Sequence, residues 1–232
     1  LEMIANCNWT RPLYVAVTVG AENFMNLGEN FIQEGLVNRI TPFSTMADPN
    51  SLGLNMRNFD TEKTYDVMMN RFKWGGLSKP GIYIDETVAR MCYTHRREMA
   101  ELALHLIAKG ERAKALKVLQ KVEKEIPNYN VPINYMSGSS DIARAYALLG
   151  QKDKARKMYD ELWKISLQYV NYYLSLNPRL FNMSQSECKK NFQIMMNLVN
   201  ENEKIDNAWA NKHATQLQNL FARFENRGGA LM

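Results

Sequence analysis

The chain has 232 residues, of which 46% are hydrophobic and 23% are charged, a composition that is ordinary for a folded protein and argues against disorder. The formal net charge is +5, but acids and bases alternate at helical spacing in basic segments such as "GQKDKARKMYDELWK", which indicates solvated helix faces and makes nucleic acid a poor candidate partner. No apolar run approaches the roughly 18 to 20 residues that cross a bilayer, and the first residues lack the basic-then-apolar layout of a signal peptide.

The first 86 residues predict a small mixed α/β module. Alternating apolar residues indicate strands, and Asp60 stands where a helix cap is expected. In chain order we expect a strand in "LYVAVTV" (13–19), an amphipathic piece (23–34), a second strand in "LVNRITPF" (36–43), a loop-rich stretch (41–59) and a helix that begins after Asp60 and is stopped by Gly75 and Gly76.

The clearest internal signal is a repeat with a period of 40 residues. Small, helix-ending and larger apolar residues recur at equal intervals, at Ala103, Gly110, Ala115, Val122 and Pro127 and then at Ala143, Gly150, Ala155, Leu162 and Leu167. Each unit predicts two antiparallel helices, because the glycine ends the first helix and the alanines let the two backbones approach. The pattern resembles the tetratricopeptide repeat, although Met99 and Ser139 stand where that repeat commonly has a large aromatic residue.

A third helix pair follows with a poorer fit. A capping box from Ser184 to Glu187 is expected to start one helix, and Gly228 and Gly229 are expected to end the other. The predicted fold class is therefore mainly α, with tetratricopeptide-like antiparallel helix pairs in a right-handed array behind a small α/β module. We place the module at 1–86 and the array with its capping helices at 87–232, as one continuous structural unit.

One helix in this array is unusually long and aromatic. It is expected to span residues 152–176, up to the proline at position 178. Its broad apolar stripe indicates a central pillar of the core. The alternative is an aromatic platform for a sugar ring or a peptide, formed by Trp163, Tyr169, Tyr172 and Tyr173.

Chemistry-bearing residues are sparse. Cys7, Cys92 and Cys188 are too far apart in sequence for a zinc site or a redox pair, so buried free thiols are expected. The histidines form no H-E-x-x-H pattern, and neither a Gly-rich phosphate loop nor a G-x-S-x-G turn is present. We therefore expect no metal, no cofactor and no catalytic residue in this chain.

Short motifs connect the chain to a known family. "NWTRPLYVAVTVG", "FIQEGLVNRITP", "DVMMNRFKWGG", "IYIDE" and "VNYYLSLNP" occur in that order. They resemble the C-terminal part of a family of bacterial multi-pass membrane proteins of unknown function, which is distantly similar to protein O-mannosyltransferases. The residues that match are Asn8, Trp9, Arg11, Pro12, Tyr14, Glu34, Gly35 and Arg39, whereas Asn38 stands where an aromatic residue is usual.

The resemblance implies a place and a context. This chain would be the extracytoplasmic (periplasmic) region of a membrane-bound, glycosyltransferase-like protein, whose membrane-embedded region would hold the presumed catalysis and would be its partner within the same polypeptide. For the matching residues we expect a structural clamp, in which Arg11 forms a fork with a carboxylate such as Glu34. The alternative is that Arg11 or Arg39 holds a phosphate or sugar at the membrane surface.

Two functions of different classes follow. The first is a non-catalytic scaffold that holds an acceptor or partner protein in a groove lined by Arg97, Ser140 and Arg144, although plain solvated surface is the simpler explanation of those three residues. The second is a glycan-binding module that uses the aromatic residues of the long helix.

Overall fold

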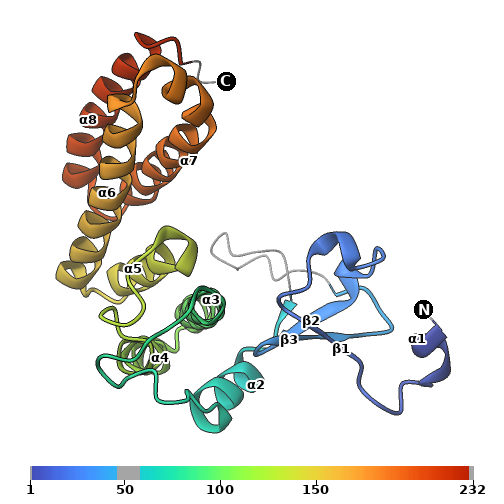
Figure 1. Cartoon of the computed structure of the whole chain (residues 1–232). Coiled ribbons are helices and arrows are strands. Elements are labelled where there is room, and N and C mark those ends of the chain that lie inside the picture. Colours follow the sequence, from blue (N-terminus) through green and yellow to red (C-terminus); the bar gives the residue numbers. More distant parts are fainter. Residues whose placement is uncertain (1, 46–57, 230–232) are drawn as a thin grey trace. The chain divides into compact units, whose positions relative to one another are not determined.

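A computed structural model describes residues 2–45 and 58–229 of the chain. The fold is mainly helical with a small four-stranded sheet near the N-terminus (Figure 1), which confirms the predicted fold class. The chain divides into two compact units, one of Leu1–Pro132 with Met136–Asp141 and the other of Ile133–Tyr135 with Ile142–Met232. The boundary after residue 86 stays a prediction.

The first unit opens with a short helix, α1 (Glu2–Asn6), and a mixed sheet. The strands lie in the order β1-β3-β2-β4, and neighbours are antiparallel except β2 and β4, which are parallel. Their bounds are Tyr14–Ala16 for β1, Phe31–Glu34 for β2, Val37–Ile40 for β3 and Asn58–Phe59 for β4. Both strands expected from the sequence form, each as a shorter element.

Strand β2 was expected to belong to an amphipathic piece. It is a strand because Gly35, with a φ of 71°, and Leu36 form a two-residue hairpin loop that folds β3 back along it. Its upstream neighbours, Ala21–Asn23 and Gly28–Asn30, form only short 3-10 turns. Pairing between strands therefore overrides the local pattern of this segment.

Two helices of the first unit begin at aspartate caps. Helix α2 (Thr61–Asp66) starts where Asp60 accepts a hydrogen bond from the backbone N–H of Lys63 at 3.0 Å, as the sequence predicts, and continues as a π-helical turn over Val67–Arg71. Helix α3 (Glu86–Ala108) starts where Asp85 accepts from the N–H of Val88 at 2.8 Å, and α4 (Arg112–Glu125) follows it. The short α3–α4 connection makes this an antiparallel pair.

The two glycines of the 40-residue period sit in equal turns. Gly110 after α3 has a φ of 81°, and Gly150 after α5 (Ser139–Leu148) has a φ of 84°. The next residue in each case donates its N–H back into the helix, from Glu111 to the Leu106 carbonyl at 2.8 Å and from Gln151 to the Tyr146 carbonyl at 2.9 Å. The assignment to tetratricopeptide repeats and the right-handed stacking of the pairs stay predictions.

The second unit contains most of α5, then α6 (Lys152–Ser175), α7 (Pro178–Asn202) and α8 (Asn207–Glu225). Helices α6, α7 and α8 pack as a bundle (Figure 1), and α6 has the length that the sequence predicts. The expected start of α7 is wrong. The helix begins at Pro178, ahead of Ser184, because Asn177 accepts from the Leu180 N–H at 3.0 Å and Pro178 occupies the first turn.

A buried arginine holds the segment that follows α4. Arg96 lies on α3 and is only 1% exposed. Its guanidinium donates to the carbonyl oxygens of Ile126 and Val131 at 2.8 Å each and of Pro132 at 3.2 Å, and to the Ser137 hydroxyl at 3.4 Å. Burial lowers the pKa of Arg96 to about 10, so the group stays charged at neutral pH. Backbone dipoles and a hydroxyl therefore stabilise this charge.

A row of polar side chains is buried between the sheet and α3. Asn38, Gln33 and Phe59 lie opposite one another across the strands and so share one face of the sheet. Gln33 donates to the Glu98 carboxylate, and the Phe59 ring stacks on His105 with 4.3 Å between centroids. Asn38 is fully buried, and within the described ranges neither of its side-chain amide atoms has a hydrogen-bond partner.

The substitution Asn38→Leu is expected to stabilise the protein. Burying an amide without hydrogen bonds is unfavourable, and a side chain of similar volume without polar atoms removes that penalty, so the free energy of unfolding should rise by about 1 kcal/mol. Urea denaturation followed by circular dichroism measures the change. A loss of stability of similar size would mean that the Asn38 amide is satisfied in solution.

Candidate functional site

An ion-paired carboxylate lies at the end of β2. Glu34 is buried, and its two carboxylate oxygens are contacted by the Arg39 Nε and the Lys63 Nζ at 2.6 Å each. The Tyr14 hydroxyl adds a longer hydrogen bond of 3.3 Å. Burial raises the pKa of Glu34, but the hydrogen bonds and charges of Lys63 and Arg39 outweigh it and hold the pKa below its ordinary value.

This cluster joins the sheet to α2. Lys63 comes from α2, whereas Tyr14, Glu34 and Arg39 come from three neighbouring strands. Beside it, the N–H of Gly35 donates to the Thr64 hydroxyl of α2 at 2.9 Å. A carboxylate already engaged by two cations is an anchor and is poorly suited to act as a general base.

The structure corrects the expected partner of Glu34. Arg11 is exposed, and within the described residues the ion pairs of Glu34 are with Arg39 and Lys63. Lys63 was missed from the sequence, although its position in the first turn of a helix capped by Asp60 was readable. Arg39 pairs with Glu34 in place of Arg11 because Arg39 lies on β3, the neighbour of the strand that carries Glu34, whereas Arg11 precedes β1.

The residues matched by family resemblance thus fall into two groups. Glu34 carries the buried carboxylate, and Tyr14, Gly35 and Arg39 lie around it. The residues ahead of β1 lie at the surface instead: Asn8, Trp9, Arg11 and Pro12.

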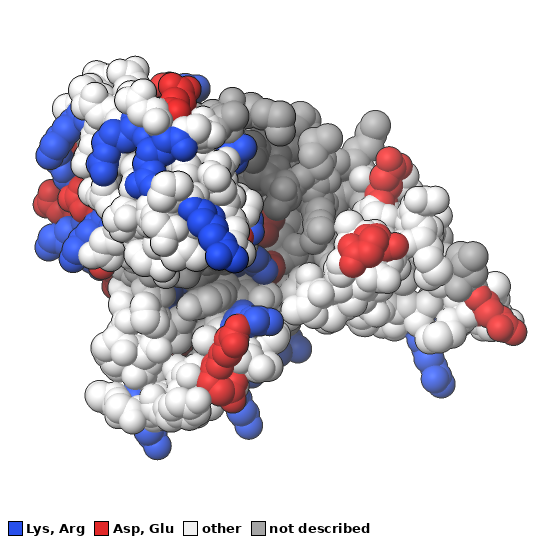
Figure 2. Space-filling view, turned by 45° about the horizontal axis from the view of Figure 1, so that its top comes forward, with Lys and Arg blue, Asp and Glu red and all other residues white. Residues whose placement is uncertain are grey.

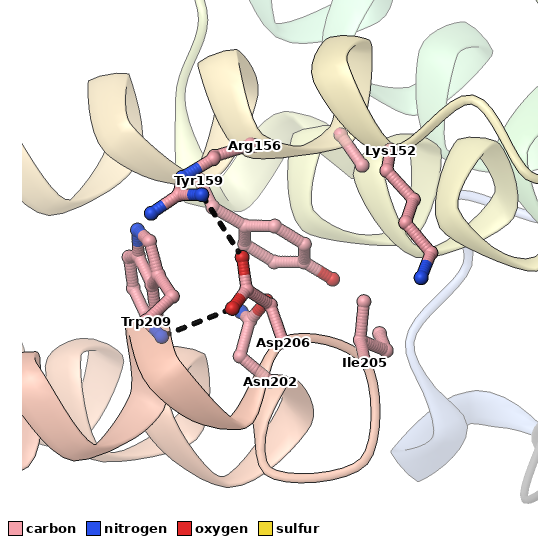
Figure 3. Close-up of a pocket in the computed structure, with 8 residues that line it drawn as sticks. Lys152, Arg156, Tyr159, Asn202, Ile205, Asp206 and Trp209 are labelled. Atoms are coloured by element: carbon pink, nitrogen blue, oxygen red, sulfur yellow. Dashed lines mark hydrogen bonds and ion pairs between the residues drawn. The ribbon is translucent and has the colours of Figure 1, made fainter.

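A pocket of about 200 Å³ lies in the second unit, where the start of α6 faces the connection between α7 and α8. Figure 3 shows the Tyr159 ring in its middle, with Arg156 and Trp209 on one side and Lys152 and Ile205 on the other. The residues that line it are Lys152, Ala155, Arg156, Tyr159, Asn202, Ile205, Asp206 and Trp209.

Hydrogen bonds fix the far wall of this pocket. Asp206 caps α8 by accepting from the Trp209 N–H at 3.0 Å, and it faces the Arg156 guanidinium at 3.5 Å. The Trp209 indole donates to Asp160 of α6 at 2.7 Å and stacks on the His213 ring. These contacts hold the Trp209 ring in place at the wall of the pocket.

The pocket has a cationic rim and an aromatic interior. Lys152 and Arg156 are exposed and lie one helical turn apart, against the single carboxylate of Asp206. Tyr159 and Trp209 are almost fully buried beneath them. This arrangement suits a group that joins an anionic atom to an apolar part, such as a carboxylate on a peptide.

The residues expected to line a groove have different environments. Arg97 is exposed on α3. A Cβ added to Gly138 (φ 71°) would lie 2.8 Å from the Cα of Arg97, so the backbone at Gly138 is in close contact with α3. Ser140 is buried, which removes it from any surface, and Arg144 is half-buried. A groove that includes Arg97 and Arg144 stays a prediction.

The expected aromatic platform is only partly at the surface. Tyr169 and Tyr172 are 51% and 58% exposed, and the Tyr173 ring lies 6.5 Å and 5.3 Å from theirs. Trp163 is buried instead, because it packs against Trp209 and His213 of α8 and donates to Gln216 at 3.0 Å. Burial, together with the negative charge of Glu187, raises the pKa of Tyr173.

Glu34→Gln is expected to destabilise the protein in a pH-dependent way. Because the pKa of Glu34 is lowered on folding, its ionised form contributes stability above about pH 4.3, and that contribution is lost as the pH falls further. We expect a loss of about 2 kcal/mol at pH 7 that shrinks towards pH 3, measured by urea denaturation of both proteins. A difference that does not change with pH would contradict the ion-pair assignment.

The comparisons with known proteins concern the N-terminal module, by which we mean residues 2–45 and 58–86. A family model described as TMEM260-associated domain 2 matches residues 1–63, which is less than half of the chain. This part is therefore similar to a domain associated with a family of membrane proteins. No curated protein and no solved structure matches the chain. Among the residues that the structure describes, each helix is too short or too polar to be a candidate membrane span. The same residues contain no cluster of three or more His, Cys, Asp or Glu side chains that could hold a metal ion.

Proposed function

We propose that this chain is a non-catalytic binding module of a membrane protein, and that it holds a carboxylate-bearing segment of a partner or acceptor protein in the pocket between α6 and α8. The observation that carries the proposal is that two exposed cations, Lys152 and Arg156, lie above the buried rings of Tyr159 and Trp209. Such a site binds and orients a ligand and contains no arrangement of nucleophile and base.

The finer context rests on resemblance. A parent protein with glycosyltransferase-like chemistry and an extracytoplasmic position on a bacterial membrane would make the bound segment an acceptor. The similarity of residues 1–63 to a membrane-protein-associated domain supports the membrane part of this proposal.

A peptide titration tests the pocket. Isothermal calorimetry on the full chain would compare an acetylated hexapeptide ending in leucine with a free carboxylate and the same peptide with a C-terminal amide. The double variant Lys152→Gln/Arg156→Gln should weaken binding of the acid about tenfold, because both charge-assisted contacts are lost. The control Lys164→Gln, an exposed cation on α6 outside the pocket, should leave binding unchanged.

The same titration, carried out with oligosaccharides, distinguishes peptide binding from the alternative of glycan binding. The exposed side chains of Tyr169 and Tyr172 favour that alternative. Sugar rings stack on flat aromatic faces, so a glycan-binding module should bind oligosaccharides and lose that binding in Tyr169→Ala/Tyr172→Ala. Oligosaccharide binding without peptide binding would overturn the peptide proposal, as would equal peptide binding by wild type and the Lys152/Arg156 variant.

A further inference from the structure

We infer that one end of the small sheet, carrying Trp9 and Phe43, is a docking surface for the interfacial region of a lipid bilayer. This inference concerns the first unit and does not depend on the pocket between α6 and α8.

Large apolar side chains are exposed along the N-terminal module. Met3 is 74% exposed, Trp9 45%, Met25 60% and Phe43 62%, and Tyr14 is 45% exposed on β1. A scattered exposed apolar residue is ordinary, but a group of large ones in one small module marks a binding surface.

The topology brings the central members of this group together. Strands β1 and β3 are antiparallel, with Tyr14 opposite Arg39, so the chain before β1 and the chain after β3 leave the same end of the sheet. The ladder extends to Leu13, whose carbonyl accepts from the Ile40 N–H at 2.9 Å. Figure 1 likewise shows α1, the approach to β1 and the exit from β3 on one side of the sheet.

The loop before β2 reaches the same end. Thr45, two residues after Phe43, donates its N–H to the Glu29 carbonyl at 2.7 Å and its hydroxyl to the same oxygen at 2.8 Å. The segment that carries Met25 is thereby tied to the segment that carries Phe43. The segments that carry Met25 and Phe43 therefore lie close together, at the end of the sheet from which the segment carrying Trp9 also leaves.

Trp9 is presented by an unusual backbone. Asn8 and Trp9 have φ values of 45° and 56°, in the left-handed region that residues with a Cβ adopt only at a cost in free energy. The turn is closed by Thr10, whose N–H and hydroxyl both reach the Cys7 carbonyl, at 3.0 and 2.9 Å. This conformation leaves the indole of Trp9 exposed.

The charged residues of this segment favour insertion of apolar side chains into the bilayer over electrostatic attraction to lipid headgroups. Residues 1–45 contain two basic residues, Arg11 and Arg39, against four acidic ones, Glu2, Glu22, Glu29 and Glu34, and Arg39 is already paired with Glu34. Figure 2 shows the visible face of this module as mostly white, with red acidic side chains more prominent than blue basic ones. A surface of this kind suits zwitterionic lipid and gains nothing from anionic headgroups.

Two observations favour a bilayer as the occupant. Tryptophan and other amphipathic aromatic side chains are the residues that settle at the headgroup level of membranes. The family model that matches residues 1–63, and so contains every residue named here, describes a domain associated with membrane proteins.

Vesicle flotation of the full chain tests the inference. Wild type should float with phosphatidylcholine vesicles, and Trp9→Ser/Phe43→Ser should lower the partition coefficient about tenfold, because two apolar side chains no longer leave water. The control Met183→Ser, a 73% exposed methionine on α7, should float like wild type. Circular dichroism melts of each variant confirm that it is folded.

Three other results would contradict the inference that this surface docks on a bilayer. Failure of folded wild type to float with phosphatidylcholine overturns the inference. So does binding that requires added phosphatidylserine and is reversed by about 0.5 M NaCl, since screening at that ionic strength removes attraction between charges and not apolar insertion. If Trp9→Ser/Phe43→Ser changes only the oligomeric state in gel filtration, the surface contacts protein.

Discussion

The burial of the Arg96 guanidinium is the constraint on which the path of this chain depends. A charge taken out of water must be compensated, and here three carbonyl oxygens and a hydroxyl from the segment between α4 and α5 provide that compensation. That segment includes Ile133–Tyr135, which belong to the second unit, so it is the covalent route between the sheet-bearing unit and the α6–α8 bundle. By ordering this segment, Arg96 positions the start of α5.

Local signals in the sequence were sufficient for much of the fold. Asp60 and the two glycines of the 40-residue period marked helix boundaries, because caps and left-handed turns depend on a few adjacent residues. The start of α7 was misplaced, since the Ser184 to Glu187 pattern competes with an equally local cap at Asn177 that is followed by proline. Strand β2 was missed because only its pairing with β3 and β4 makes it a strand.

The candidate sites were harder to predict, because they depend on which side chains meet in space. The sequence points to Glu34 and Arg39 but makes Arg11 the expected partner of Glu34, since the strand pairing that brings Arg39 close to Glu34 cannot be read from composition. The pocket draws Lys152 and Arg156 from α6 and Asp206 and Trp209 from the start of α8, about 50 residues away along the chain. Trp163 shares a helix with Tyr169, yet it faces α8 and is buried.

The two units carry different chemistry on their surfaces. The N-terminal module exposes aromatic and methionine side chains with few bases, and the α6–α8 bundle presents a cationic pocket over buried aromatics. The most direct measurement is amide hydrogen exchange by mass spectrometry on wild type and Arg96→Lys, because one ammonium cannot reach the four acceptors of the guanidinium. Exchange should accelerate at least about tenfold in peptides covering residues 126–137 and stay unchanged in α7, whereas unchanged exchange in 126–137, or equal acceleration throughout the chain, would contradict the ordering role of Arg96.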